Sequence, residues 1–268
     1  MDRAQKLAAG SDDCEALALL FSDPGIIDDG TVAGRLREIL AITEHFAVPG
    51  LQTRIRFHDR GFKGESQPTP GGPGFRDPWP NSDNQVGHFL SAVGMNFQPA
   101  VIRREVGGVG PTVRWLLRAP DTMSDREVVQ RLVIGHEKAQ DPTVDAPSAA
   151  AGALGGLPGG SIGAIVGAAA GAAMSVVSGF RVQFEAVTPS DMSAWAAALS
   201  ALGNNSVINL AAAEPYLAKI PINYSLSGNS IQDLRLSLCG WYLGQAIAAN
   251  RFASREDVAK WVRVNLHA

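Results

Sequence analysis

The sequence predicts a mainly α-helical fold, of the α+β type with one or two short strands, built around a central glycine-rich helix. Helix-start signals recur along the chain, each a Ser or Thr placed just before a helical pattern. Strict alternation of apolar and polar residues, which is typical of strands, is limited to 51–58 and 180–186. Glycines at every fourth position from 155 to 171 place small residues along one ridge of a helix.

Size and composition restrict the class of protein. The chain has 268 residues, 46% of them hydrophobic and 18% charged, which suits one large folded domain or two small ones. The formal net charge is −3 and no basic stripe is present, so nucleic acid is not an expected partner. The two cysteines, Cys14 and Cys239, are too few for a disulfide framework.

The N-terminal residues bear on the cellular compartment in which the protein is made. The stretch from Met1 to Asp13 lacks the apolar core of a signal peptide, and the low cysteine content fits synthesis in the cytosol. We therefore expect cytoplasmic synthesis without a signal peptide. Membrane association, or export by a route that reads no such signal, would then follow synthesis.

In the first third of the chain, the pattern predicts two helices, a strand and a long loop. The helices are expected over 3–20 and 31–46, each ended by a turn cluster rich in Pro and Gly. The alternation over 51–58 predicts the strand. The Pro/Gly-rich loop over 59–83 has a length that is usually functional or mobile in a compact domain.

Two histidine-bearing helices follow, and each begins with a capping box. In a capping box the N-cap hydroxyl accepts the backbone N–H of the residue three positions later, and the side chain of that residue accepts the N-cap N–H. The two boxes are Ser82 with Gln85 and Ser124 with Glu127. The second helix is expected over 125–138, and a shorter helix over 111–117 lies between the two.

The last third of the chain is predicted to hold one strand and four helices. The alternation over 180–186 predicts the strand. Thr188, followed by Pro189 at the first helical position, opens a helix that should end near Gly203. The other helices are expected over 210–218, from Ser230 to about 250, and from Ser254 onward.

These elements divide the chain into three parts. We predict an N-terminal helical domain over 1–145 and a C-terminal helical segment over 181–268 that packs on it. Between them lies a Gly/Ala segment over 146–180, which contains no Asp, Glu, Lys or Arg.

The middle segment carries a ridge of small residues. The ridge consists of Gly155, Gly159, Gly163, Gly167 and Gly171. Each glycine disfavours an isolated helix in water by about 1 kcal/mol relative to alanine, so the helix needs a close-packed partner or lipid. The stepped glycines resemble the glycine-zipper segments of membrane-active proteins. We expect a buried or oligomerising helix first, membrane insertion second and a flexible linker third.

Four residues are the candidates for a polar site: His88, His136, Glu137 and Asp233. His136 follows Leu132 by four residues, so it lies on the apolar face of its helix. Two buried histidines beside carboxylates can bind a metal ion or form an acid–base pair. His88, His136 and Glu137 are the expected ligands of a divalent metal, and all four residues are candidate catalytic groups.

Structural roles compete with these assignments. Both histidines can be core side chains bonded to backbone or carboxylate groups, and Asp233 can be a first-turn acid favoured by the helix dipole. Asp233 also begins a polar and small stripe at helical spacing, completed by Ser237, Gly240 and Gly244. Neither cysteine is expected to act as a nucleophile.

Two classes of function remain open. The first is an effector-like hydrolase with a His/carboxylate site, with or without a metal ion. Its motivation is the pair of inward histidines, the long loop beside one of them and the absence of any binding-module motif. The alternative is a non-enzymatic protein whose glycine run inserts into a membrane or joins copies of the chain. Metal analysis and liposome flotation would separate the two.

Overall fold

The computed structural model confirms the mainly helical fold. It describes residues 6–7, 12–42, 60–64, 72–76, 85–105, 114–115, 117–139, 181–203, 206–222 and 230–268. Its main helices are α2 (Asp13–Ser22), α3 (Val32–Ile42), α4 (Gln85–Glu105), α6 (Asp125–Ala139), α10 (Pro189–Leu202), α11 (Leu210–Leu217), α12 (Ile231–Ala248) and α13 (Arg255–Leu266). Within the described ranges, β-structure is limited to isolated bridges, which pair Phe62 with His267 and Gly64 with Gly74.

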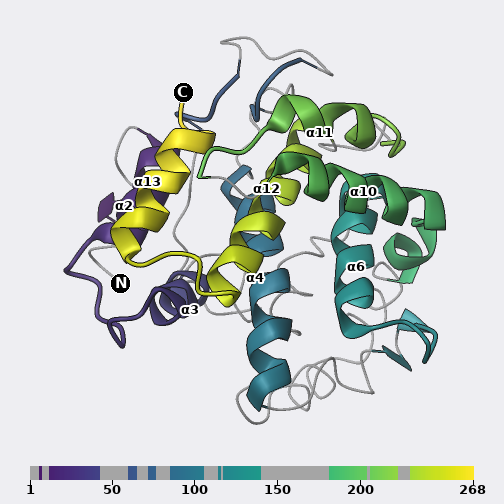
Figure 1. Cartoon of the computed structure of the whole chain (residues 1–268), viewed down its shortest axis with the longest axis horizontal. Helices are drawn as coiled ribbons and strands as arrows, with labels where there is room; N and C mark the ends of the chain where they lie inside the picture. The colour runs from purple at the N-terminus through teal and green to yellow at the C-terminus, as the bar shows by residue number, and fades with distance from the viewer. Residues whose placement is uncertain are drawn as a thin grey trace.

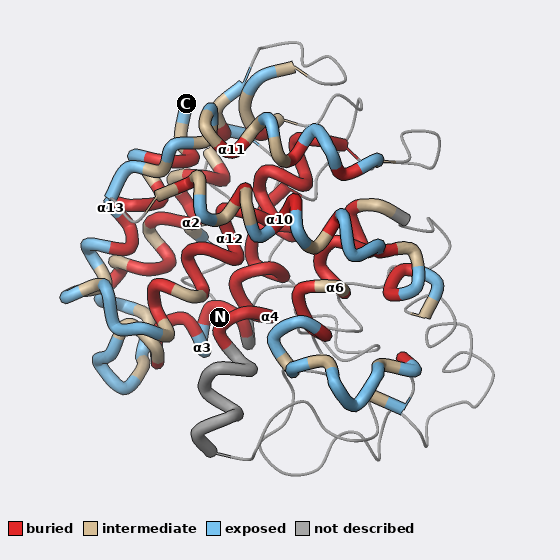
Figure 2. The backbone as a smooth tube through the Cα atoms, turned by 45° about the vertical axis from the view of Figure 1, so that its right-hand side comes forward, coloured by how far each residue is buried: buried red, intermediate tan, exposed pale blue. Residues whose placement is uncertain are grey.

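Helix α12 forms the centre of the molecule. Every residue from Ile231 to Gly244 is buried, on all faces of the helix, and Figure 2 shows buried backbone in red along α12 and its neighbours. A helix that is apolar or buried all round belongs to the core of a larger protein. Helix α4 is its main partner, while α10, α11, α6 and α3 also contact it (Figure 1).

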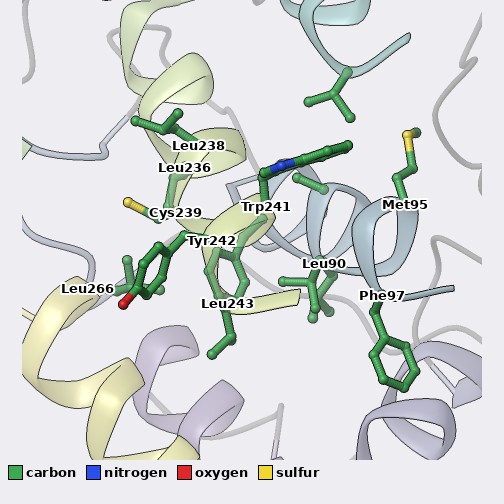
Figure 3. Packing of buried hydrophobic residues seen from close by; sticks show 14 of the residues in the cluster. Leu90, Met95, Phe97, Leu236, Leu238, Cys239, Trp241, Tyr242, Leu243 and Leu266 are labelled. Atoms are coloured by element: carbon green, nitrogen blue, oxygen red, sulfur yellow. The ribbon is translucent and has the colours of Figure 1, made fainter. Parts of the chain in front are cut away.

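The interface of α4 with α12 is closely packed because α12 presents glycines there. A Cβ atom at Gly240 would lie 2.3 Å from the Phe89 carbonyl oxygen, and one at Gly244 would lie 2.4 Å from that of Val93. Gly240 and Gly244, the two glycines of the predicted polar and small stripe, therefore face α4. Larger side chains fill the space on either side (Figure 3), among them Leu90, Met95 and Phe97 of α4 and Leu236, Leu238, Trp241 and Leu243 of α12.

The last helix of the chain packs on the first long one. Arg263 of α13 binds Glu15 of α2 with two N–O distances of 2.6 and 2.8 Å. His267 Nε2 lies 2.9 Å from a carboxylate oxygen of Asp12, the residue that caps α2. These contacts join the two ends of the described chain beside the α4–α12 core (Figure 1).

Local capping fixes the helix starts that the sequence predicts. In α10 and α13 the N-cap hydroxyl accepts the N–H of an Asp three residues on, whose carboxylate accepts the N-cap N–H in return. Ser124 and Glu127 make the same exchange at the start of α6. Gly203 ends α10 with φ of 79°, which is a left-handed conformation that favours glycine.

The predicted strand over 180–186 is wrong, because residues 181–186 are helical. Val182, one of the apolar members of the alternation, is 59% exposed. Gln183, Phe184 and Val187 are buried instead, which is the spacing of one helical face. Arg131 of α6 donates a hydrogen bond of 2.8 Å to the Phe184 carbonyl, so contact with α6 holds this segment in place.

Several predictions concern residues outside the described ranges. They are the strand over 51–58, the capping residue Ser82 and the whole glycine run over 146–180. Among the helices that the structure does describe, none combines the length and the apolarity that crossing a membrane requires. The three-part division of the chain and the membrane or oligomer role of the glycines stay predictions.

Ser254→Ala is expected to lower the free energy of unfolding by about 0.5–2 kcal/mol, because the hydroxyl accepts the Asp257 N–H at 3.1 Å. Chemical denaturation measures the change. Ser190→Ala, at an exposed serine in the first turn of α10, is the matched control and should stay within about 0.5 kcal/mol of the parent. Equal effects of the two substitutions would contradict the capping role.

Candidate functional site

The four candidate polar residues lie where three helices meet. His88 is in the first turn of α4, Asp233 is in the first turn of α12, and His136 and Glu137 are in the last turn of α6. The three helices contact one another in the middle of the molecule (Figure 1). The fold therefore brings together polar residues from both halves of the sequence, all of them buried.

His88 lies between two carboxylates. Its Nδ1 is 3.0 Å from Glu137 Oε1, within hydrogen-bonding distance. Its Nε2 is 3.8 Å from Asp233 Oδ1, which is within the range of an ion pair but longer than a hydrogen bond. One imidazole thus connects a carboxylate of α6 with a carboxylate of α12.

His136 lies against the other histidine. The centroids of the His88 and His136 rings are 5.2 Å apart and the ring planes are tilted by 31°. The expectation that these histidines are close enough to share one site is therefore confirmed. Their metal-binding and catalytic roles stay predictions.

Two further polar side chains complete the cluster. Ser237 donates its hydroxyl hydrogen to Glu137 Oε1 at 2.5 Å, and Gln85 Nε2 donates to Asp233 Oδ1 at 3.1 Å. Sequence reasoning placed Ser237 on the polar stripe without giving it a partner, and assigned Gln85 only a capping role. Amphipathic spacing indicated that Ser237 faces inward, but no local signal linked Gln85 to Asp233.

Several buried atoms of the cluster have no hydrogen-bond partner among the described residues. They are both ring nitrogens of His136 and Oε2 of Glu137. His136 is 5% exposed and Glu137 is 1% exposed, so bulk water does not satisfy these atoms. Because more than nine in ten buried polar groups in folded proteins are paired, three such atoms in one cluster leave hydrogen-bonding or ligating capacity unused.

Burial and mutual contact shift the protonation of these groups. Burial lowers the pKa of His136 from 6.5 to about 4, a shift that Glu137 opposes and His88 reinforces. Burial by itself would raise the pKa of Glu137. The neighbouring imidazoles and the hydrogen bonds from His88 and Ser237 outweigh it and hold that pKa below its ordinary value. At neutral pH the site therefore contains a neutral His136 with a free lone pair beside an ionised Glu137.

The geometry fits a divalent transition metal ion. One ligand atom from each of His88, His136 and Glu137 lies within 4.8 Å of the others. Two atoms bound tetrahedrally to one ion at about 2.1 Å are about 3.4 Å apart, so the most distant pair of ligands would need to close by up to roughly 1.4 Å. Two imidazoles and a carboxylate are a donor set used by zinc and by non-haem iron.

The cysteines do not contribute to the site. Cys14 and Cys239 are both buried and unpaired by any disulfide. Burial raises the pKa of each thiol far above its ordinary value, and neighbouring acids add to this effect at Cys14. Thiols that stay protonated are poor nucleophiles and poor metal ligands.

Comparison of the chain with protein-family models, with characterised proteins and with solved structures finds no match. The chemistry of the buried cluster is therefore the main indication of function.

Proposed function

We propose that the protein is a metal-dependent hydrolase whose divalent cation is bound by His88, His136 and Glu137. The observation that carries this proposal is the set of buried atoms without partners among the described residues, two on His136 and one on Glu137, in side chains that cluster with His88. A structural core histidine would be expected to have its ring nitrogens bonded, as buried polar groups usually are. His136 departs from that rule on both nitrogens among the described residues.

The protonation of the cluster supports a cation. Metal ligands have to be deprotonated, and the depressed pKa of His136 keeps its ring neutral at pH 7. Glu137, which is also deprotonated, supplies negative charge in a region that excludes water. An ionised carboxylate in such a place is stable only when it is paired or bound to a metal.

The arrangement of the side chains suits hydrolysis. A divalent ion with three protein ligands keeps a position for water, lowers the pKa of that water and polarises a bound carbonyl or phosphoryl group. Ser237 bonds Oε1 of Glu137, which leaves Oε2 for the cation. Asp233, which the sequence named as a candidate catalytic group, faces the other ring nitrogen of His88 and would act through that imidazole.

Burial limits the reactants of this proposed enzyme. The side chains of His88, Glu137 and Asp233 are each at most 2% exposed. Ligands this deep in the core favour a small substrate over a protein or polymer. An effector-like role is compatible with such chemistry and is part of the proposal.

His136→Gln is expected to abolish binding of one equivalent of Co²⁺ or Zn²⁺, because it removes one of three ligands. Titration of chelator-treated protein, followed by elemental analysis, measures the loss. The matched control is His267→Gln, which replaces a half-exposed histidine that pairs with Asp12. A panel of small ester and phosphoester substrates should be turned over only by metal-loaded protein.

Two outcomes would contradict the proposed metal site. One is a wild-type protein that retains no metal at micromolar concentrations of either ion. The other is metal binding that His136→Gln and the control lower to the same extent. Metal binding without turnover of any substrate would leave the site in place and remove the hydrolase assignment.

A further inference from the structure

Asp233 follows the N-cap residue of its helix by three positions, as an acidic residue also does in α6, α10 and α13, but the surroundings of Asp233 differ. The carboxylates of Asp191, Asp257 and Glu127 each accept the backbone N–H of the N-cap residue three positions earlier. In α12 the N-cap Ser230 likewise accepts the Asp233 N–H, at 3.1 Å. What distinguishes α12 is burial, since Ser230 and Asp233 are fully buried whereas the capping pairs that open α6 and α13 are exposed.

The Asp233 carboxylate also reaches the polar cluster. Its Oδ2 accepts the Ser230 hydroxyl at 2.8 Å, and its Oδ1 accepts Gln85 Nε2 at 3.1 Å. The same Oδ1 lies 3.8 Å from His88 Nε2. Two hydrogen bonds thus hold a fully buried carboxylate next to the ring nitrogen that does not face Glu137.

We propose that Asp233 is the positioning residue of His88: it accepts the Nε2–H of the imidazole and so directs Nδ1 at the cation bound with His136 and Glu137. Histidines that bind metals usually donate their other ring N–H to a carboxylate or carbonyl group, which fixes the tautomer and the ring orientation. A cation at Nδ1 would displace to solvent the proton that Nδ1 shares with Glu137 Oε1, and the ring would keep its Nε2–H toward Asp233 Oδ1. The metal-binding part of this inference rests on the proposed function, whereas the orientation of His88 does not.

The test compares Asp233→Ala with Asp257→Ala. Both substitutions remove a first-turn aspartate that follows an N-cap serine, but Asp257 is in the exposed capping box of α13. Asp233→Ala is expected to weaken Co²⁺ binding by about 10–100-fold and to change the visible spectrum of the bound ion. Asp257→Ala should leave affinity within about twofold. Asp233→Asn, which keeps an oxygen that can accept Nε2–H, should recover part of the affinity.

A second measurement needs no metal. At one fixed pH, nitrogen NMR of the metal-free protein reports whether His88 Nε2 carries a hydrogen-bonded proton. Because Nδ1 already donates to Glu137 in the metal-free protein, a proton on Nε2 as well makes the His88 ring a cation between two carboxylates. That second proton should be present in the wild type and in Asp257→Ala, and lost or exposed to fast exchange in Asp233→Ala.

The combined outcomes separate the two proposals. If wild-type protein binds Co²⁺ and Asp233→Ala binds it equally well with the same spectrum, the positioning role is overturned and the metal site stands. If no variant binds Co²⁺ but the Nε2 proton depends on Asp233, the metal site is overturned and the orientation of His88 stands. Loss of both signals in the wild type overturns both.

Discussion

Replacing Gly240 and Gly244 together by alanine is expected to destabilise the protein by about 2–6 kcal/mol, since overpacking costs about 1–3 kcal/mol at each site. The added Cβ atoms would lie 2.3 and 2.4 Å from backbone carbonyl oxygens of α4. Real Cβ atoms do not approach backbone so closely, so α4 and α12 would have to separate. The same double substitution in an unobstructed helix would gain about 1 kcal/mol at each site from helix propensity, so the sign of the effect tests the contact.

Gly34→Ala is the matched control for this prediction. A Cβ atom there would meet the end of the Asp29 side chain, which is half-exposed and can rotate away. Its effect on stability should be under about 1 kcal/mol in either direction. Urea denaturation monitored by tryptophan fluorescence measures all three proteins. A double mutant as stable as the control would show that α4 and α12 are not in close contact.

The metal-free protein is expected to lose up to about 3 kcal/mol of stability through His136 as the pH falls from 7 to 4. The pKa of His136 is lowered from 6.5 to about 4, and each unit corresponds to about 1.36 kcal/mol. In this window the unfolded state binds more protons than the folded state, so the free energy of unfolding rises with pH. The contribution is therefore complete above pH 6.5 and is lost progressively down to pH 4.

His136→Gln removes the titrating group and should flatten this part of the pH profile. Denaturant unfolding at closely spaced pH values, with chelator present throughout, measures the difference between wild type and variant. Ser190→Ala, an exposed position whose change removes no ionisable group, is the control and should keep the wild-type slope. If wild type and His136→Gln lose stability in parallel between pH 6.5 and 4, His136 is not buried in its neutral form.

Local sequence patterns predicted part of the candidate site, and long-range packing formed the rest. Spacing on an amphipathic helix was enough to place His136 inside, because the core face of a helix is a local property. The role of Gln85 was not predictable, because its partner Asp233 is 148 residues away in the sequence. Ser237 and Glu137 are separated by 100 residues, and their hydrogen bond likewise exists only after α6 and α12 have packed.

The sequence by itself determined the helices and most of their starts. An N-cap hydrogen bond joins residues only three positions apart, so Ser124, Thr188, Ser230 and Ser254 can specify their helices without the rest of the chain. Tertiary structure decided the conformation of residues 181–186, where the alternation of apolar and polar residues predicts a strand. Packing against Arg131 and Gly135 of α6 selected a helix instead.

Tertiary structure also decided which contacts are made by the aspartates that lie three residues after an N-cap serine. Asp233 and Asp257 follow their N-cap serines at the same spacing, so the sequence makes them equivalent. Only the packing of α4 against α12 places Gln85 and His88 beside one of the two carboxylates. Asp257 stays at the surface and completes its own helix, while Asp233 is turned into the buried cluster. The physical reason is that a carboxylate taken out of water must be satisfied by whatever donors the fold brings to it, and those donors are far away in sequence.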